Sequence, residues 1–207
     1  MRRCGDEVAA RICPCGSPPQ PASGAKLVDA PLTLLALFAA IGAFGALVVE
    51  WILGRAVRIG SLAPPQMHME ILIDAPLSRV WEYASDVQRQ PEWMHEMKRV
   101  EMITPGPIKV GSRGRATVRI FGISTTDDVV ITRLEPPHAF GIRHEGKFTG
   151  EGLLEFSAAS EQQTLIRWME YLRPPLFPML AGFLQRPILR RIFQSDLRHL
   201  KEILEER

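Results

Sequence analysis

The chain has 207 residues, of which 46% are apolar and 23% charged, and its formal net charge is +2. This length accommodates one ordinary domain with an appendage rather than two full domains. A nearly neutral charge, without a long basic run or patterned aromatic residues, argues against nucleic acid as a partner.

The three cysteines, Cys4, Cys13 and Cys15, all lie in the first fifteen residues. We therefore expect the rest of the chain to fold without disulfides. Cys13 and Cys15 lack the two-residue spacer of redox and zinc motifs, and no nearby histidine completes a ligand set. We expect no metal site there.

Residues 1–29 are rich in proline, serine, glycine and alanine and show no apolar periodicity. This composition predicts a disordered leader. A wrongly chosen start codon would produce the same kind of segment, and the sequence leaves that alternative open.

Residues 30–49, "APLTLLALFAAIGAFGALVV", contain no charged residue. At about 1.5 Å per residue, a helix of this length covers the roughly 30 Å hydrocarbon core of a bilayer. A buried soluble helix is disfavoured because a domain of this size has no core deep enough to surround it. A cleaved signal peptide fits poorly because the apolar run is long and no clear small-x-small site follows. We predict a transmembrane helix over residues 30–53, and hence a single-pass membrane protein.

The orientation of this helix is not decided by its flanking charges. Arg11 and Lys26 precede it closely, and Arg55 and Arg58 follow it, so the positive-inside rule is balanced. We favour the cytoplasmic side for the remainder of the chain. Residues 54–67 read as a linker that reaches at most about 45 Å, which keeps the following domain near the membrane.

Residues 68–207 are predicted to form one α+β domain. "HMEILIDAP" alternates apolar and polar residues like a half-buried strand, and a helix follows with one apolar stripe formed by Leu77, Val80, Trp81, Ala84 and Val87. Several strands come next, separated by glycine and proline turns. A last helix carries Leu189, Ile192, Phe193, Leu197, Leu200, Ile203 and Leu204 at helical spacing. A curved antiparallel sheet around this long C-terminal helix buries these faces most economically.

The stretch "DAPLSRVWEYASDVQRQPEWM" resembles the start of the polyketide cyclase/dehydrase and lipid-transport family of the START-like, helix-grip superfamily. The matching positions are Ala75, Pro76, Val80, Trp81, Asp86, Pro91 and Trp93. "KVGSRGR", "RLEPPHAF", the glycine before "LLEF" and "TLIRW" also resemble the family. The resemblance covers residues 67–207 and implies a helix-grip fold with an apolar cavity between sheet and helix.

Candidate ligand contacts follow from this implied cavity. Phe140, Ile142 and His144 share one face of a predicted strand, and Ile166, Trp168 and Glu170 share one face of another. Trp168 could line the cavity and Glu170 its mouth, whereas His144 is either a polar group inside the cavity or an ordinary satisfied histidine. The predicted ligand-binding set is Trp93, Met94, Phe140, Ile142, His144, Phe156, Ile166, Trp168 and Glu170, although Trp93 also fits the role of a core filler. Arg115, Thr117 and Arg119 share another face, either the solvent side or a rim that meets an acidic ligand group.

No catalytic motif accompanies these residues. The five histidines are scattered, and neither a glycine-flanked serine elbow nor a glycine-rich phosphate loop occurs. We therefore name no catalytic residues and no cofactor, and we expect membrane-anchored binding of a hydrophobic small molecule such as a lipid, isoprenoid or quinone. An enzyme of the cyclase or dehydratase type and a protein-binding module are the alternatives.

The segment from Pro174 to Phe193 is apolar in its first half and basic in its second. It could be the loop and first turns of the last helix. It could also be a lip that contacts the membrane through Leu176, Phe177, Met179, Leu180 and Phe183.

Overall fold

The computed structural model describes residues 30–120 and 122–206, so the predicted leader and the three cysteines lie outside the described residues. The chain divides into a unit that ends at Ile41 and a second unit, Gly42–Arg207. Helix α1 (Ala30–Arg58) belongs partly to each and continues through residues 54–58 of the predicted linker. Within the described ranges, α1 is the one helix long and apolar enough to cross a membrane, a test that a signal sequence also passes.

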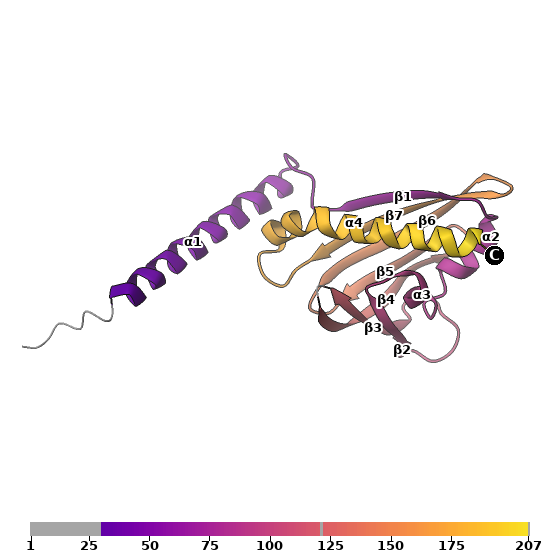
Figure 1. Ribbon diagram of the computed structural model, residues 1–207, viewed down its shortest axis with the longest axis horizontal. Coiled ribbons are helices and arrows are strands. Elements are labelled where there is room, and N and C mark those ends of the chain that lie inside the picture. The colour runs from indigo at the N-terminus through magenta and orange to yellow at the C-terminus, as the bar shows by residue number, and fades with distance from the viewer. Residues whose placement is uncertain (1–29, 121, 207) are drawn as a thin grey trace, which may run out of the picture. The chain divides into compact units, whose positions relative to one another are not determined.

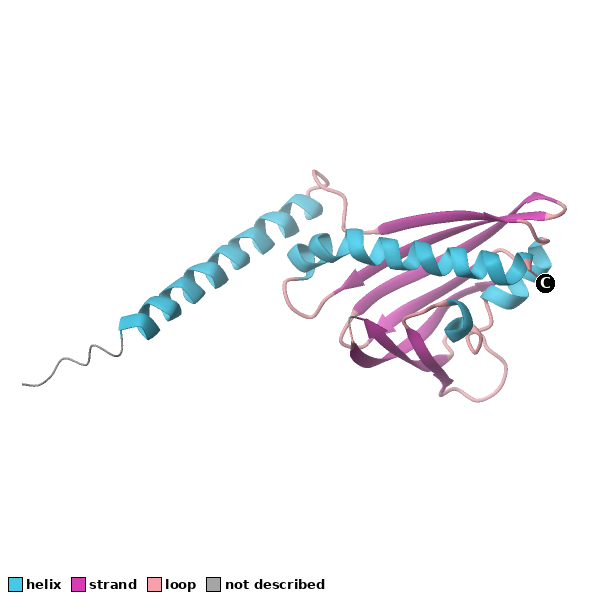
Figure 2. Ribbon diagram, viewed as in Figure 1, coloured by secondary structure: helices cyan, strands magenta, loops and turns pink. Residues whose placement is uncertain are grey.

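The second unit is built on one antiparallel sheet with the strand order β1-β7-β6-β5-β4-β3-β2. Its strands are β1 (Met67–Ile73), β2 (Met97–Met102), β3 (Arg113–Ile120), β4 (Ile123–Glu135), β5 (Ala139–Glu145), β6 (Thr149–Ser160) and β7 (Gln163–Arg173). The long helix α4 (Pro178–Glu205) lies across this sheet, and the short helices α2 (Leu77–Ala84) and α3 (Gln90–Trp93) lie between β1 and β2 in the chain (Figure 1). Figure 2 shows the curved sheet and the helix along it, which confirms the predicted α+β helix-grip fold.

Alternation along the strands decides which side chains face α4. In β7, Thr164, Ile166, Trp168 and Glu170 are buried while intervening residues are more exposed. In α2, Val80, Trp81 and Ala84 are buried, so the predicted apolar stripe is confirmed. The last helix begins earlier than the apolar repeat indicates, at Pro178, and Pro187 lies inside it.

Trp93 belongs to the core of this unit. Its side chain is fully buried, and its ring meets Trp168 edge to face with 6.0 Å between ring centroids. Leu197 and Leu200 of α4 are also fully buried. The tryptophan of the "PEWM" stretch therefore joins α3 to β7, the strand next to the edge strand β1.

The N-terminus of α4 is capped from a distant part of the chain. Phe177 precedes the helix in the left-handed region, with φ 50°, and offers no side-chain cap. Both carboxylate oxygens of Glu50 instead accept from the Met179 N–H at 3.0 and 3.2 Å, and one accepts from the Leu180 N–H at 2.9 Å. A carboxylate satisfies the free N–H groups at a helix N-terminus and opposes the helix dipole favourably. The end of α1 is thereby joined to the domain within Gly42–Arg207.

Candidate functional site

A partly open cavity of about 120 Å³ lies between the sheet and α4. Its apolar wall comes from the inner face of β2 to β5, from Trp168 and Leu172 of β7, and from Phe193 of α4. Many wall residues on β3 and β4 are small, including Gly114, Ala116 and Val129. These short side chains leave the space open, whereas larger ones would fill it.

A polar group is built into one part of this wall. Glu170 is only 3% exposed, and its two oxygens hold Trp168 Nε1 at 2.9 Å and His144 Nε2 at 3.1 Å. Gly152 of β6 makes room for the carboxylate, since a Cβ there would lie 2.4 Å from Glu170 Oε2. A buried carboxylate must be hydrogen-bonded, and here both oxygens are satisfied by side chains from the cavity wall.

The neighbours of His144 favour its charged form. Burial by itself lowers the pKa of His144, but the hydrogen bond and charge of Glu170, with the charge of Asp127, outweigh burial and raise the pKa above its usual value. His144 and Glu170 therefore form a hydrogen-bonded pair at the wall of the apolar cavity, in which the carboxylate favours the protonated imidazole. This pair can hold or transfer a proton at His144 Nε2.

A second polar group lies where α3, the turn after it and α4 meet. Asp196 of α4 is 2% exposed and accepts from the backbone N–H of His95, while its Oδ1 lies 3.1 Å from His95 Nδ1. Burial raises the pKa of Asp196 to about 6 and the charge of Glu96 acts in the same direction, against the hydrogen bonds of His95. Glu96 also lines the cavity, and its Oε2 is buried without a hydrogen-bond partner among the described residues.

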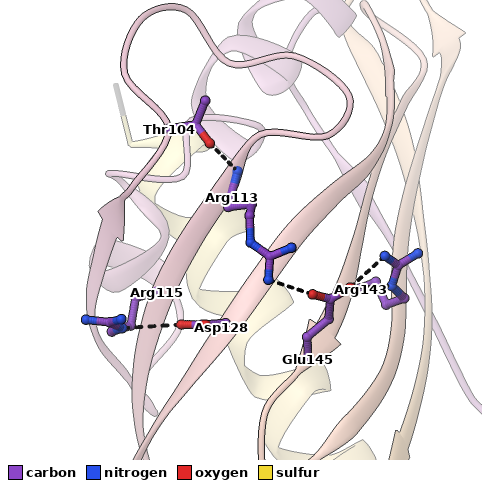
Figure 3. Close-up of polar contacts among 6 residues, drawn as sticks. All are labelled: Thr104, Arg113, Arg115, Asp128, Arg143 and Glu145. Carbon is purple, nitrogen blue, oxygen red and sulfur yellow. Dashed lines mark hydrogen bonds and ion pairs between the residues drawn. The ribbon is translucent and has the colours of Figure 1, made fainter.

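The outer face of the same strands has a different pattern. Arg113 and Arg143 both donate to Glu145, and Arg115 donates to Asp128 at 3.3 Å (Figure 3). These side chains leave the strands on the side away from the cavity, because neighbouring residues of a strand point to opposite faces. Arg115 and Arg119 are thus on the solvent side, the first of the two roles considered for them.

The predicted ligand-binding residues fall into two groups. Met94, Ile142, His144, Trp168 and Glu170 line the cavity. Phe140, Phe156 and Ile166 of the sheet and Trp93 of α3 are packed into the core and do not line the cavity. The physical reason is visible at Phe156, which Trp81 of α2 covers at 5.3 Å between ring centroids. Ligand contact by any of these residues stays a prediction.

Several lining residues were not singled out from the sequence, including Gln90, Glu96, Met97, Asp127 and Asp196. Asp196 did carry a signal, because it lies seven residues after Leu189 and four before Leu200, within the apolar stripe of the last helix. Glu96 and Met97 had none, since they lie where an irregular turn enters β2.

The part of the chain that the structure describes contains no group of three or more histidine, cysteine, aspartate or glutamate side chains that could hold a metal ion. The cavity lining combines an apolar wall with a histidine, four carboxyl side chains and an amide. Such a mixture, mostly apolar with a few convergent polar groups, is typical of small-molecule sites.

Solved structures share this architecture at low sequence identity. The protein TTHA0849 from Thermus thermophilus is 21% identical, with a TM-score of 0.56 over 69% of this chain and 98% of its own. A START superfamily protein from Mycobacterium smegmatis is 16% identical, with a TM-score of 0.53 over 68% of this chain and 97% of its own. The di-domain ARO/CYC BexL from the BE-7585A biosynthetic pathway is 18% identical, with a TM-score of 0.55 over 68% of this chain and 46% of its own. These likenesses show the fold.

No protein of curated function matches the chain in sequence. The model of a protein family, described as polyketide cyclase / dehydrase and lipid transport, matches residues 64–205, well over half of the chain. The family resemblance seen in the sequence is thereby confirmed, and the chain belongs to the polyketide cyclase / dehydrase and lipid transport family.

Proposed function

We propose that this protein binds a hydrophobic small molecule, such as a lipid, isoprenoid or quinone, in the cavity between the sheet and α4, and exchanges it with a membrane to which α1 anchors it. The observation that carries the proposal is the mostly apolar cavity itself, in a family whose description covers both lipid transport and cyclase or dehydrase activity. Burial of apolar ligand surface there is favourable at roughly 25 cal/mol per Å².

The size of the cavity restricts what enters it without rearrangement. A space of about 120 Å³ is close to that of an apolar cavity that accepts a single benzene ring. A longer ligand requires the wall to widen, and the wall offers a means for this. Met94, Met97 and Met102 are flexible lining residues, and β2 is an edge strand with an irregular register between Met97 and Arg99.

Membrane anchoring is the second part of the proposal. The apolar window of α1 has none of its residues buried, as a lipid-facing helix would. Glu50 joins the end of α1 to Met179 and Leu180, two of the five residues predicted to contact the membrane. Of the other three, Leu176 is 72% exposed, and Phe177 and Phe183 are partly buried. We propose that this lip meets the bilayer and that the domain lies on its cytoplasmic side.

The division of the chain is proposed on the same basis. Residues 1–29 would be the leader, residues 30–53 the membrane span, residues 54–67 the linker and residues 68–207 the binding domain. The last turns of α1, residues 54–58, would then rise from the membrane surface as the first part of the linker.

A test of the binding function is native mass spectrometry with lipid extraction on the full chain. We expect a copurifying apolar molecule that is lost in Ala116→Phe, because Ala116 lines the cavity and the larger ring fills it. Thr117→Phe is the matched control, since Thr117 lies next to it on β3 and hydrogen-bonds to Thr126 on the outer face. A chain that carries no apolar molecule and takes up none from mixed lipid vesicles would contradict the proposal.

One observation favours a second function, an enzyme of the cyclase or dehydratase type. His144 is coupled to buried Glu170 on the cavity wall, and the pKa of His144 is raised. Such pairs suit proton transfer to and from a bound substrate. His144→Gln distinguishes the two functions. In both cases the variant should keep its ligand with a modest change in affinity. Only an enzyme would turn over a polyketide-like substrate before the substitution and lose that turnover after it.

A further inference from the structure

The charged residues of the cavity wall are nearly all of one sign. Glu96, Asp127, Glu170 and Asp196 line the cavity with His144, and no lysine or arginine belongs to the described lining. We propose that the cavity selects its apolar ligand by a hydrogen-bond-donating group, a hydroxyl or an ammonium, and rejects ligands that carry a carboxylate or phosphate. This inference rests on the proposed function, because it specifies the ligand of the same cavity.

One pair of carboxyl groups adds negative charge to the cavity wall, but its oxygens already accept hydrogen bonds from the protein and have few positions left for a ligand. Both oxygens of Glu170 are used by Trp168 and His144. Asp127 accepts from the backbone N–H of Lys147 at 2.8 Å. An anionic ligand group beside these two carboxyls would lose its hydration and meet like charge, and the cationic donor beside them, His144, is already hydrogen-bonded to Glu170.

The other pair supplies the acceptor that a ligand could use. Asp196 is engaged by His95, but Glu96 Oε2 is buried and has no partner in the described part of the chain. A carboxylate oxygen that is buried beside a cavity without a partner is costly unless a donor reaches it. A ligand hydroxyl or ammonium would satisfy this atom, whereas a carboxylate would leave it unpaired and add a second negative charge.

The arginines of the sheet do not offset the excess of acidic side chains in the cavity. Arg113, Arg115 and Arg143 leave the strands around the cavity, and all three pair with acidic residues on the outer face (Figure 3). Strand alternation holds them one sheet thickness away from the ligand. A fatty acid or phospholipid would therefore find no arginine or lysine in the described lining and only His144, which already pairs with Glu170, while an alcohol, a phenol or an amine would find an acceptor.

The test compares three probes that share an aromatic ring and a short chain: phenylbutylamine, phenylbutanol and phenylbutyrate. The full chain is placed in phosphatidylcholine nanodiscs at neutral pH, and binding is measured by titration calorimetry with empty nanodiscs subtracted. We expect the amine and the alcohol to bind at least about ten-fold more tightly than the carboxylate, the effect of one charge-assisted hydrogen bond. This ranking needs no variant and so does not depend on how a substitution affects folding.

The variant Glu96→Gln tests the named acceptor. It should weaken phenylbutylamine binding by about ten-fold and narrow the gap between amine and carboxylate. Glu101→Gln is the control, because Glu101 lies on the same strand as the cavity-lining Met97, is exposed and does not line the cavity. Equal effects of the two variants would overturn the role of Glu96.

The outcomes separate this inference from the proposed function. If phenylbutyrate binds as tightly as phenylbutylamine and Ala116→Phe abolishes both, the cavity binds apolar ligands and the selectivity inference alone is wrong. If none of the three probes binds, the binding function fails and the inference fails with it.

Discussion

The space between the sheet and α4 is filled toward α2 and hollow toward β2. At the filled end, Trp81 packs edge to face on Phe156, and Leu197 and Leu200 are fully buried. At the hollow end, the same sheet face presents Gly114, Ala116 and other small or flexible side chains around the cavity. Most side chains at both ends are apolar, and the candidate site differs from the core by its smaller side chains and by the polar groups in the cavity wall.

The difference teaches where stability and binding reside in one continuous fold. Close packing makes each methylene at the filled end contribute through many contacts. The hollow end lacks those contacts and holds the polar groups that a ligand could use. The following substitutions test this division, from the largest expected effect to the smallest.

Replacement of Trp93 by alanine should give the largest loss of folding stability. Trp93 is fully buried against Trp168, and removal of such a side chain costs about 3–5 kcal/mol. Met94→Ala is the comparison, since Met94 lines the cavity and already lacks neighbours on one side. We expect less than half the loss at Met94, measured by urea unfolding of the full chain in detergent. Equal losses would mean that the two ends are packed alike.

Much of the filled end could be predicted from the sequence. The stripe of α2 and the alternation of β7 place Val80, Trp81 and Ile166 inside, because a helix or strand that buries one face must repeat its apolar residues with the period of the element. The family resemblance at Ala75, Pro76 and Trp93 then gives the order of the elements. The apolar periodicity and the family resemblance together predicted a sheet around a long last helix.

The hollow end could be predicted only in part. Periodicity placed Ile142, His144 and Glu170 on the inner face, but it placed Phe140 and Ile166 there equally. Which of them meets empty space depends on what α2 and α3 cover, and that is a tertiary property. The unpaired oxygen of Glu96 could not be predicted for the same reason, because Glu96 lies in an irregular turn whose neighbours are distant in sequence.

Asp196 lies at the boundary of the two ends and should make stability depend on pH. The folded state raises its pKa from 3.8 to about 6, so the folded chain holds this proton more tightly than the unfolded chain. Stability from this group is therefore fully present below pH 3.8 and is lost as pH rises through about 6. A difference of about two units between the folded-state and unfolded-state pKa corresponds to about 3 kcal/mol of unfolding free energy.

Asp196→Asn removes this dependence. We expect the variant to be more stable than the natural chain by up to about 3 kcal/mol at neutral pH and no more stable in acid, as measured by urea unfolding across the pH range. The asparagine oxygen can still accept from the His95 N–H, so the turn is retained. A constant difference at every pH would show that Asp196 acts through packing and not through its charge.

The same alanine-to-leucine substitution should change folding stability in opposite directions at the two ends. Ala116→Leu extends into the cavity and should stabilise the protein by about 1 kcal/mol, since each newly buried methylene contributes about 0.8 kcal/mol and some strain offsets it. Ala84→Leu places the same side chain where Ala84 is fully buried in the core, and overpacking there costs about 1–3 kcal/mol. Thermal unfolding of both variants measures the contrast. Destabilisation by both would mean that the hollow end has no room for added side chains.

The smallest effect is expected on the outer face of the sheet, behind the cavity. Arg115 and Asp128 form an ion pair at 3.3 Å, with side chains 51% and 40% exposed. Such pairs contribute about 0–1 kcal/mol because water screens them, so Arg115→Gln should change the unfolding free energy by less than about 0.5 kcal/mol. Ligand affinity should also stay unchanged, since the arginine points away from the cavity (Figure 3). A clear loss of affinity would show that charge on the outer face reaches the ligand through the sheet, and the separation of the two faces on which the acidic-cavity proposal depends would then be wrong.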